Sequence, residues 1–148
     1  MNRLRALRDD ERGSTLPLVI FFMVLALLVI IAVAGATSLY IERKRLLTLA
    51  DGAALAGAEA FDLSQVSAAD GELRIRLEGD RVRAAAEEYL DAAPHEQLRD
   101  LALSDAGTPD GHSAAVSLTA SWRPPVLSLF LPEGITLRVD STARSVFR

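Results

Sequence analysis

The sequence predicts an α+β fold in which a long N-terminal helix, first transmembrane and then amphipathic, precedes a small antiparallel-sheet domain. Three observations support this prediction. Residues 13–41 carry no charged side chain, residues 46–61 carry small or apolar side chains at helical spacing, and several segments between residues 73 and 144 alternate apolar with polar side chains. A chain of 148 residues has room for one modest domain beside such a helix.

The uncharged run has the length of a membrane span. A helix over Leu16–Ile41 would be about 39 Å long, and the hydrocarbon core of a bilayer is about 30 Å thick. A domain this small cannot cover an apolar helix on all sides, so we expect the lipid bilayer to be its partner. Ser14 is placed to cap the helix, and Pro17 falls in its first turn, where a missing N–H group is harmless.

The flanking sequences predict an orientation. Four arginines precede the span and a basic cluster at residues 43–45 follows it, so the positive-inside rule favours a cytoplasmic N-terminus by a small margin. The short tail before the span and the larger domain after it favour the same topology. We therefore expect a cytoplasmic tail over residues 1–13, a helix over 14–61 and an extracytoplasmic α+β domain over 62–148, held at the inner (cytoplasmic) membrane.

A cleaved signal sequence is the alternative interpretation of the same run. Ala34, Gly35 and Ala36 form the small-x-small pattern that signal peptidase recognises, and cleavage near Ala36 would release a secreted soluble domain. The apolar stretch before this site exceeds the usual length of about 7–15 residues. Cleavage there would also free an amphipathic helix with an uncovered apolar face. Both arguments favour a retained membrane anchor.

No helix-breaking residue separates the span from the next segment, so we expect one continuous helix over residues 14–61. In its second half, small and apolar side chains recur on one face. Small residues let another helix approach closely, so we interpret this face as a helix-packing interface with other subunits. The alternative is that the face packs on the protein's own sheet. The expected interface consists of Ala50, Ala53, Ala54, Gly57 and Ala58.

The same region resembles a known family. The Arg-Gly-Ser sequence at residues 12–14, the apolar span, the basic cluster and an Ala-rich box are similar, in this order, to the N-terminal region of Tad (tight adherence) pilus-assembly proteins of the TadE/TadG type. The resemblance implies a non-enzymatic minor pilin or pseudopilin of a pilus or related secretion system. It implies other pilin-like subunits, an assembly ATPase and inner-membrane platform proteins as partners. The matching box residues are Leu47, Ala50, Asp51, Ala53, Ala54, Leu55 and Ala56.

Two positions in this region bear on processing and local charge. In pilins cut by prepilin peptidase, a Gly precedes the cleaved bond and a Glu follows five residues after that Gly. Here Gly13 and Ser14 form the candidate processing site, but Leu18 stands at the position of the Glu, so we expect inefficient cleavage or none. Asp51, the acid inside the box, is interpreted as a solvated carboxylate near the basic cluster; the alternative is that it pairs with a cation of a partner near the membrane face.

The composition argues against most other function classes. A net charge of −4 and a pI near 5.2 provide no basic surface for nucleic acid. The absence of Cys excludes disulfides, thiolate nucleophiles and Cys-based metal sites, and the histidines are His95 and His112. Asp105, Asp110 and His112 share a loop without the spacing of an EF-hand, and Ser113 adjoins His112 too closely to be activated by it. We expect no catalytic residue, no cofactor and no metal.

The remaining residues predict the sheet domain. Pro94 ends a helix, Pro and Gly mark the turns, and residues 63–70 form a connector. A membrane-anchored binding or accessory protein unrelated to pili would share this architecture, and it is the other alternative function. The expected elements are strands at residues 73–77, 98–103, 114–122 and 135–144, a helix at 81–92, a turn-rich loop at 105–113, and a short helix or apolar loop at 126–131.

Overall fold

The structure is a computed structural model that describes residues 15–60, 67–69, 72–74, 77–124 and 134–144. The chain divides into two compact units, residues 1–37 and 38–148, and the first helix, α1 (Thr15–Glu59), contributes residues to both. Pro17 lies in the first turn of α1, where its missing N–H group removes no helical hydrogen bond. After α1 ends, the N–H group of Ala60 donates to the carbonyl oxygen of Gly57 at 3.3 Å.

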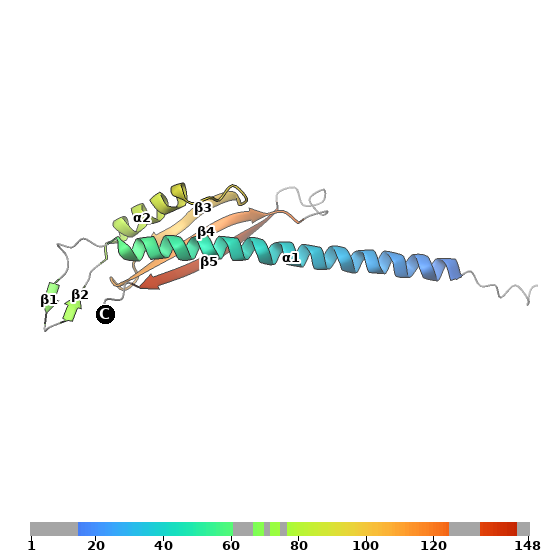
Figure 1. Cartoon of the computed structure of the whole chain (residues 1–148), viewed down its shortest axis with the longest axis horizontal. Coiled ribbons are helices and arrows are strands. Elements are labelled where there is room, and N and C mark those ends of the chain that lie inside the picture. The colour runs from blue at the N-terminus through green and yellow to red at the C-terminus, as the bar shows by residue number, and fades with distance from the viewer. Residues whose placement is uncertain (1–14, 61–66, 70–71, 75–76, 125–133, 145–148) are drawn as a thin grey trace, which may run out of the picture. The chain divides into compact units, whose positions relative to one another are not determined.

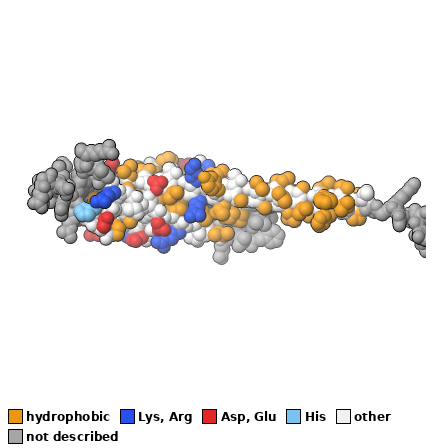
Figure 2. All heavy atoms as spheres, turned by 90° about the horizontal axis from the view of Figure 1, so that it is seen from below, with side chains coloured by type: hydrophobic (Ala, Val, Ile, Leu, Met, Phe, Trp, Pro, Cys, Tyr) orange, Lys and Arg blue, Asp and Glu red, His pale blue; other side chains and the backbone are white. Residues whose placement is uncertain are grey.

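In the first unit, the described part of α1 is apolar on every side and exposed. Figure 2 shows hydrophobic side chains along this part of the helix. By length and composition α1 can cross a membrane, and none of its most apolar stretch is buried. This part of the chain therefore fits a single-pass membrane anchor. The exposed large side chains before Thr37 are Leu16, Leu18, Val19, Ile20, Phe21, Phe22, Met23, Val24, Leu25, Leu27, Leu28, Val29, Ile30 and Val33.

The second unit is built on a three-stranded antiparallel sheet in the order β3-β4-β5. The strands are β3 (Arg99–Gly107), β4 (Ser113–Trp122) and β5 (Ile135–Arg144), and helix α2 (Gly79–Ala92) precedes them in the chain. The part of α1 after Thr37 lies with α2 on one face of this sheet (Figure 1). A separate antiparallel pair consists of β1 (Ser67–Ala69) and β2 (Glu72–Arg74).

The core of the second unit follows from the period-two pattern of β4. Every second residue of this strand points toward the helices, so the central strand supplies one continuous apolar row. α1 and α2 cover the row with small or branched side chains, which allows both helices to approach the sheet closely. The fully buried side chains of largest volume are Leu46, Val82, Val116 and Leu118. The buried row in β4 consists of Ala114, Val116, Leu118, Ala120 and Trp122.

The predicted fold class is confirmed: a long apolar N-terminal helix and a small antiparallel sheet are both present. β5 has its predicted bounds, and α2 begins two residues earlier than expected. β3 differs more, because it runs on to Gly107 and so occupies the first part of the expected loop at 105–113. The expected connector at 63–70 contains β1, and the expected element at 126–131 lies outside the described residues.

β3 was hard to predict because its register is interrupted. Its pairing with β4 shifts between Arg99 and Ala102 and again between Leu103 and Asp105. Each shift breaks the alternation of inward and outward side chains on which sequence prediction depends. Asp100 lies at the first shift with a φ of 51°, a left-handed conformation that Asp tolerates better than most residues.

Candidate functional site

The small-residue face of α1 is buried within the second unit. The five residues expected to form an interface between subunits are all buried, four of them with no exposed surface. Ala50, Ala53 and Ala54 join the main core with residues of α2 and the sheet, and Ala58 joins a smaller cluster with Val82 and Ala114. In this structure the face packs on the protein's own domain, and contact with another subunit stays a prediction.

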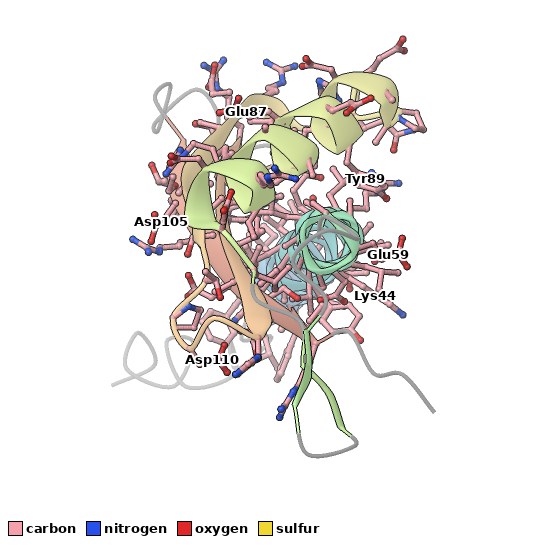
Figure 3. The ribbon with its side chains drawn as sticks, turned by 90° about the vertical axis from the view of Figure 1, so that its left-hand side faces the viewer. Lys44, Glu59, Glu87, Tyr89, Asp105 and Asp110 are labelled. Atoms are coloured by element: carbon pink, nitrogen blue, oxygen red, sulfur yellow. The ribbon has the colours of Figure 1, made fainter. Side chains whose placement is uncertain are left out.

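Two glycines show how closely α1 packs in the second unit: Gly57 on the small-residue face, and Gly52 on the side that Tyr89 covers. A Cβ atom on Gly52 would overlap the hydroxyl group of Tyr89, whose ring lies against α1 from α2 (Figure 3). A Cβ atom on Gly57 would lie 2.9 Å from Cγ1 of Val82. The Ala-rich box thus lets α1 fit closely against α2 and the sheet, and its composition follows from packing inside one chain.

The opposite face of α1 carries exposed apolar residues. Leu47 and Leu55 are 40% and 52% exposed, and Tyr40 is 66% exposed. Leu47, Asp51 and Leu55 follow one another at four-residue spacing, so they form a stripe along the helix. We call these three residues together with Tyr40 the outer stripe. It presents two Leu side chains to solvent on a helix whose other face is already covered.

Asp51 has a partner that the sequence interpretation missed. The hydroxyl group of Ser141 in β5 donates to Oδ1 of Asp51 at 2.6 Å. Asp51 remains exposed, as expected, but its bond joins α1 to the edge strand of the sheet. The signal in the sequence was weak: Ser141 occupies an inward position in the alternation of β5, and an inward Ser needs a hydrogen-bond partner.

The second unit begins where Trp122 meets α1. Nε1 of Trp122 donates to the hydroxyl oxygen of Ser38 at 3.3 Å, and the indole is buried. Ser38 is the first residue of that unit, so the folded domain starts inside the run we assigned to the membrane. An apolar helix over Leu16–Thr37 is about 33 Å long, closer to the ~30 Å hydrocarbon core than the 39 Å of the original assignment. A span that ended at Thr37 would match the hydrocarbon core more closely than the predicted Leu16–Ile41.

The polar loop before β4 is a turn held by one carboxylate. Oδ1 of Asp110 accepts the backbone N–H groups of His112 at 2.8 Å and Ser113 at 2.6 Å, and the Ser113 hydroxyl donates to Oδ2 at 2.9 Å. These hydrogen bonds lower the pKa of Asp110 to about 2, with the two backbone donors as the main cause. The hydroxyl of Ser113 is thus committed to Asp110.

The structure does not bring Asp105 and Asp110 together. Asp105 projects from the sheet region away from Asp110 (Figure 3) and pairs with Arg83 of α2 at 3.5 Å. Within the described ranges, no group of three or more His, Asp or Glu side chains is placed to hold a metal ion. The candidate processing site at Gly13 and Ser14 lies outside the described residues.

Comparison with known proteins supports the N-terminal assignment. Residues 13–65 match the family model described as "Tad: Putative Flp pilus-assembly TadE/G-like". This match confirms the resemblance expected from the sequence, and its range covers all of α1. No match was found among curated proteins or among solved structures.

Proposed function

We propose that this chain, whose residues 13–65 match the TadE/G-like pilus-assembly family model, is a minor pilin or pseudopilin of a Tad pilus or related secretion system. In this proposal Leu16–Thr37 anchors the protein in the inner membrane. The N-terminal tail is cytoplasmic and the second unit is extracytoplasmic. The subunit acts through contacts with other pilin-like subunits and with membrane platform proteins, and it performs no catalysis.

The coincidence of the family match with α1 is the observation that carries this proposal. The matched range contains both halves of the helix, the apolar half before Thr37 and the half that packs on the sheet. An assembly subunit needs both properties. It must be held in the bilayer before assembly, and it must present a rigid surface to its neighbours afterwards. A helix fixed to a sheet by its small residues provides such rigidity.

We place the subunit contact on the outer stripe rather than on the small-residue face. The small residues are buried by α2 and the sheet, so a second helix could reach them only if the domain opened. The outer stripe needs no such opening, because Leu47 and Leu55 are already exposed. Burial of exposed Leu side chains stabilises association by roughly 1.5–3 kcal/mol for each side chain that becomes fully covered.

The experiment is complementation in the source cell. Deletion of the gene should abolish Tad pili or the secretion that depends on them, and the full chain should restore either one. Leu55→Arg should accumulate normally in the membrane and fail to restore assembly, because it puts a charge in the contact. Ala84→Arg, an exposed substitution on α2, is the matched control and should restore assembly. Normal pili after deletion would refute the role in assembly. Full activity of Leu55→Arg would refute the subunit contact at the outer stripe.

A released domain is the second candidate, because one observation favours it. Cleavage after Ala36 would leave Thr37 and the whole second unit, which begins at Ser38. The helix freed in this way would keep its apolar face buried in the domain, so the objection that it would be uncovered does not hold. The intact mass and N-terminal sequence of the protein from membranes and medium decide between the candidates. A soluble chain that starts at Thr37 supports release, and a membrane-bound chain that starts at Met1 or Ser14 supports the anchor.

A further inference from the structure

A groove with a volume of about 710 Å³ lies between α1 and the connection from α2 to β3. Leu49, Tyr89 and Leu98 supply apolar surface, and Lys44 and Arg45 supply two cations. Its volume is within the range of about 300–1,000 Å³ that is usual for small-molecule sites. A site that combines an apolar lining with two cations suits an anionic amphiphile.

The two cations are available to a ligand. Lys44 is exposed and points outward (Figure 3), and among the described residues its ammonium group forms no ion pair. The guanidinium of Arg45 is half exposed and lies 3.9 Å from Glu42, which is too long for a strong hydrogen bond. Glu96 is the acidic residue that lines the groove, so the cations outnumber it. The lining residues therefore carry a net positive charge, although Glu42 lies beside Arg45 and the whole chain is acidic.

The position of the groove along α1 indicates that the anion is a lipid headgroup. Lys44 follows Thr37, the end of the anchor in our proposal, by seven residues, about 10 Å along the helix. The polar layer beside the hydrocarbon core is about 5–8 Å thick on each side. Side chains on a helix tilt toward its N-terminus, so Lys44 and Arg45 extend back toward the bilayer. In a chain anchored as we propose, their charged ends would reach the level of lipid headgroups.

We propose that this groove binds one anionic phospholipid of the membrane in which α1 is anchored. Lys44 and Arg45 hold the phosphate, the arginine by paired N–H donors and the lysine as a point charge. The apolar surface of Leu49, Tyr89 and Leu98 covers the part of the lipid nearest the headgroup. The bound lipid would fix the depth and rotation of the domain at the membrane surface. This inference requires the membrane anchor and does not require pilus assembly, so each can fail without the other.

The test is native mass spectrometry of the full chain in mild detergent. It is incubated with phosphatidylglycerol, with phosphatidylcholine of the same acyl chains, or with inorganic phosphate. We expect at least fivefold more bound phosphatidylglycerol than phosphatidylcholine, and no retained inorganic phosphate. The double variant Lys44→Gln, Arg45→Gln should bind at least fivefold less phosphatidylglycerol than the original protein. Arg43→Gln is the control: it removes one positive charge from an exposed neighbour that does not line the groove, and should change binding less than twofold.

A second variant separates shape from charge. Thr48→Phe puts an aromatic ring into the groove and leaves both cations in place, so it should also lower phosphatidylglycerol binding at least fivefold. Leu47→Phe, on the exposed side of the same turn, should not lower it. Equal binding of the two lipids, an equal loss in Arg43→Gln, or full binding in Thr48→Phe would each overturn the proposal. Retention of inorganic phosphate without lipid preference would assign the cations to a free anion and would overturn it too.

Discussion

The two halves of α1 have similar helical geometry and opposite relations to their surroundings. Before Thr37, large apolar side chains are exposed on all sides, and Phe21 and Phe22 are 61% and 56% exposed. After Ser38, the apolar side chains on one face are buried, and they are mostly alanines. The first half therefore fits an apolar solvent, whereas the second half fits closely against a protein surface.

This comparison also separates two uses of small residues. In a membrane, small residues on a helix commonly mark a contact with another helix. In the second half of α1 they mark the contact with the protein's own α2 and sheet, at Gly52 and Gly57 above all. The exposed Leu residues on the opposite face are then the ones left for partners. Each prediction below changes one half, or one face, and leaves the other intact.

The largest effect is expected from a cavity in the core of the second unit. Leu118 has no exposed surface, so Leu118→Ala should destabilise the domain by about 2–5 kcal/mol. Leu25→Ala removes the same atoms from the apolar half, where the side chain is 44% exposed, and should leave domain stability unchanged. Denaturant unfolding followed by Trp122 fluorescence measures both, because Trp122 is the chain's one tryptophan. Equal effects would contradict the division of α1 into two halves.

Overpacking of the small-residue face should give the next largest effect. Gly57→Leu drives a branched side chain against Val82 and should cost about 1–3 kcal/mol. Leu55→Ala, two residues away on the outer stripe, should change stability by less than about 0.5 kcal/mol. The melting temperatures of the two variants measure the difference. A stable Gly57→Leu that fails to assemble would instead return the small-residue face to the role of a subunit contact.

The fold could be predicted largely from periodicity, and the site only in part. The uncharged run predicts a helix in lipid because water does not solvate so long an apolar surface. The alternation in β5 predicts both ends of that strand to the residue. The partner of the small-residue face could not be predicted, because small side chains suit a neighbouring subunit and the protein's own sheet equally well. The bond between Ser141 and Asp51 joins positions 90 residues apart, which no local pattern indicates.

That long-range bond should make a small contribution. Ser141→Ala removes the donor to Asp51 and should lower stability by about 0.5–1 kcal/mol, at the low end for a hydrogen bond because Asp51 can bond to water instead. Thr142→Ala, the exposed neighbour in β5, is the control. A double variant that combines Ser141→Ala with Asp51→Ala should show less than additive loss. Strict additivity would mean that the two side chains do not interact in solution.

The smallest effect is a dependence on pH at the β3–β4 turn. The pKa of Asp110 falls from 3.8 to about 2 on folding. Its hydrogen bonds therefore stabilise the folded state fully at pH values above 3.8. This stabilisation is lost as the pH falls from 3.8 toward 2, because protonation removes the charged acceptor. Asp110→Asn should therefore weaken the pH dependence of unfolding in that window and nowhere else. A variant whose unfolding follows the same pH curve as the original protein would show that Asp110 does not hold the turn.

The most direct test of the division of α1 between membrane and domain is labelling of single cysteines along α1 in intact membranes. The natural chain contains no Cys, so each introduced thiol reports alone. With a membrane-impermeant maleimide, Cys at Leu25 or Val29 should stay unlabelled until detergent is added, although both positions are exposed on the protein. When the maleimide is added to the outer side, Cys at Leu47 or Leu55 should be labelled at once. Cys at Ala53 should be labelled only after the domain unfolds. Rapid labelling at Leu25 without detergent, or equal labelling at Ala53 and Leu55, would contradict the division of α1 between membrane and domain.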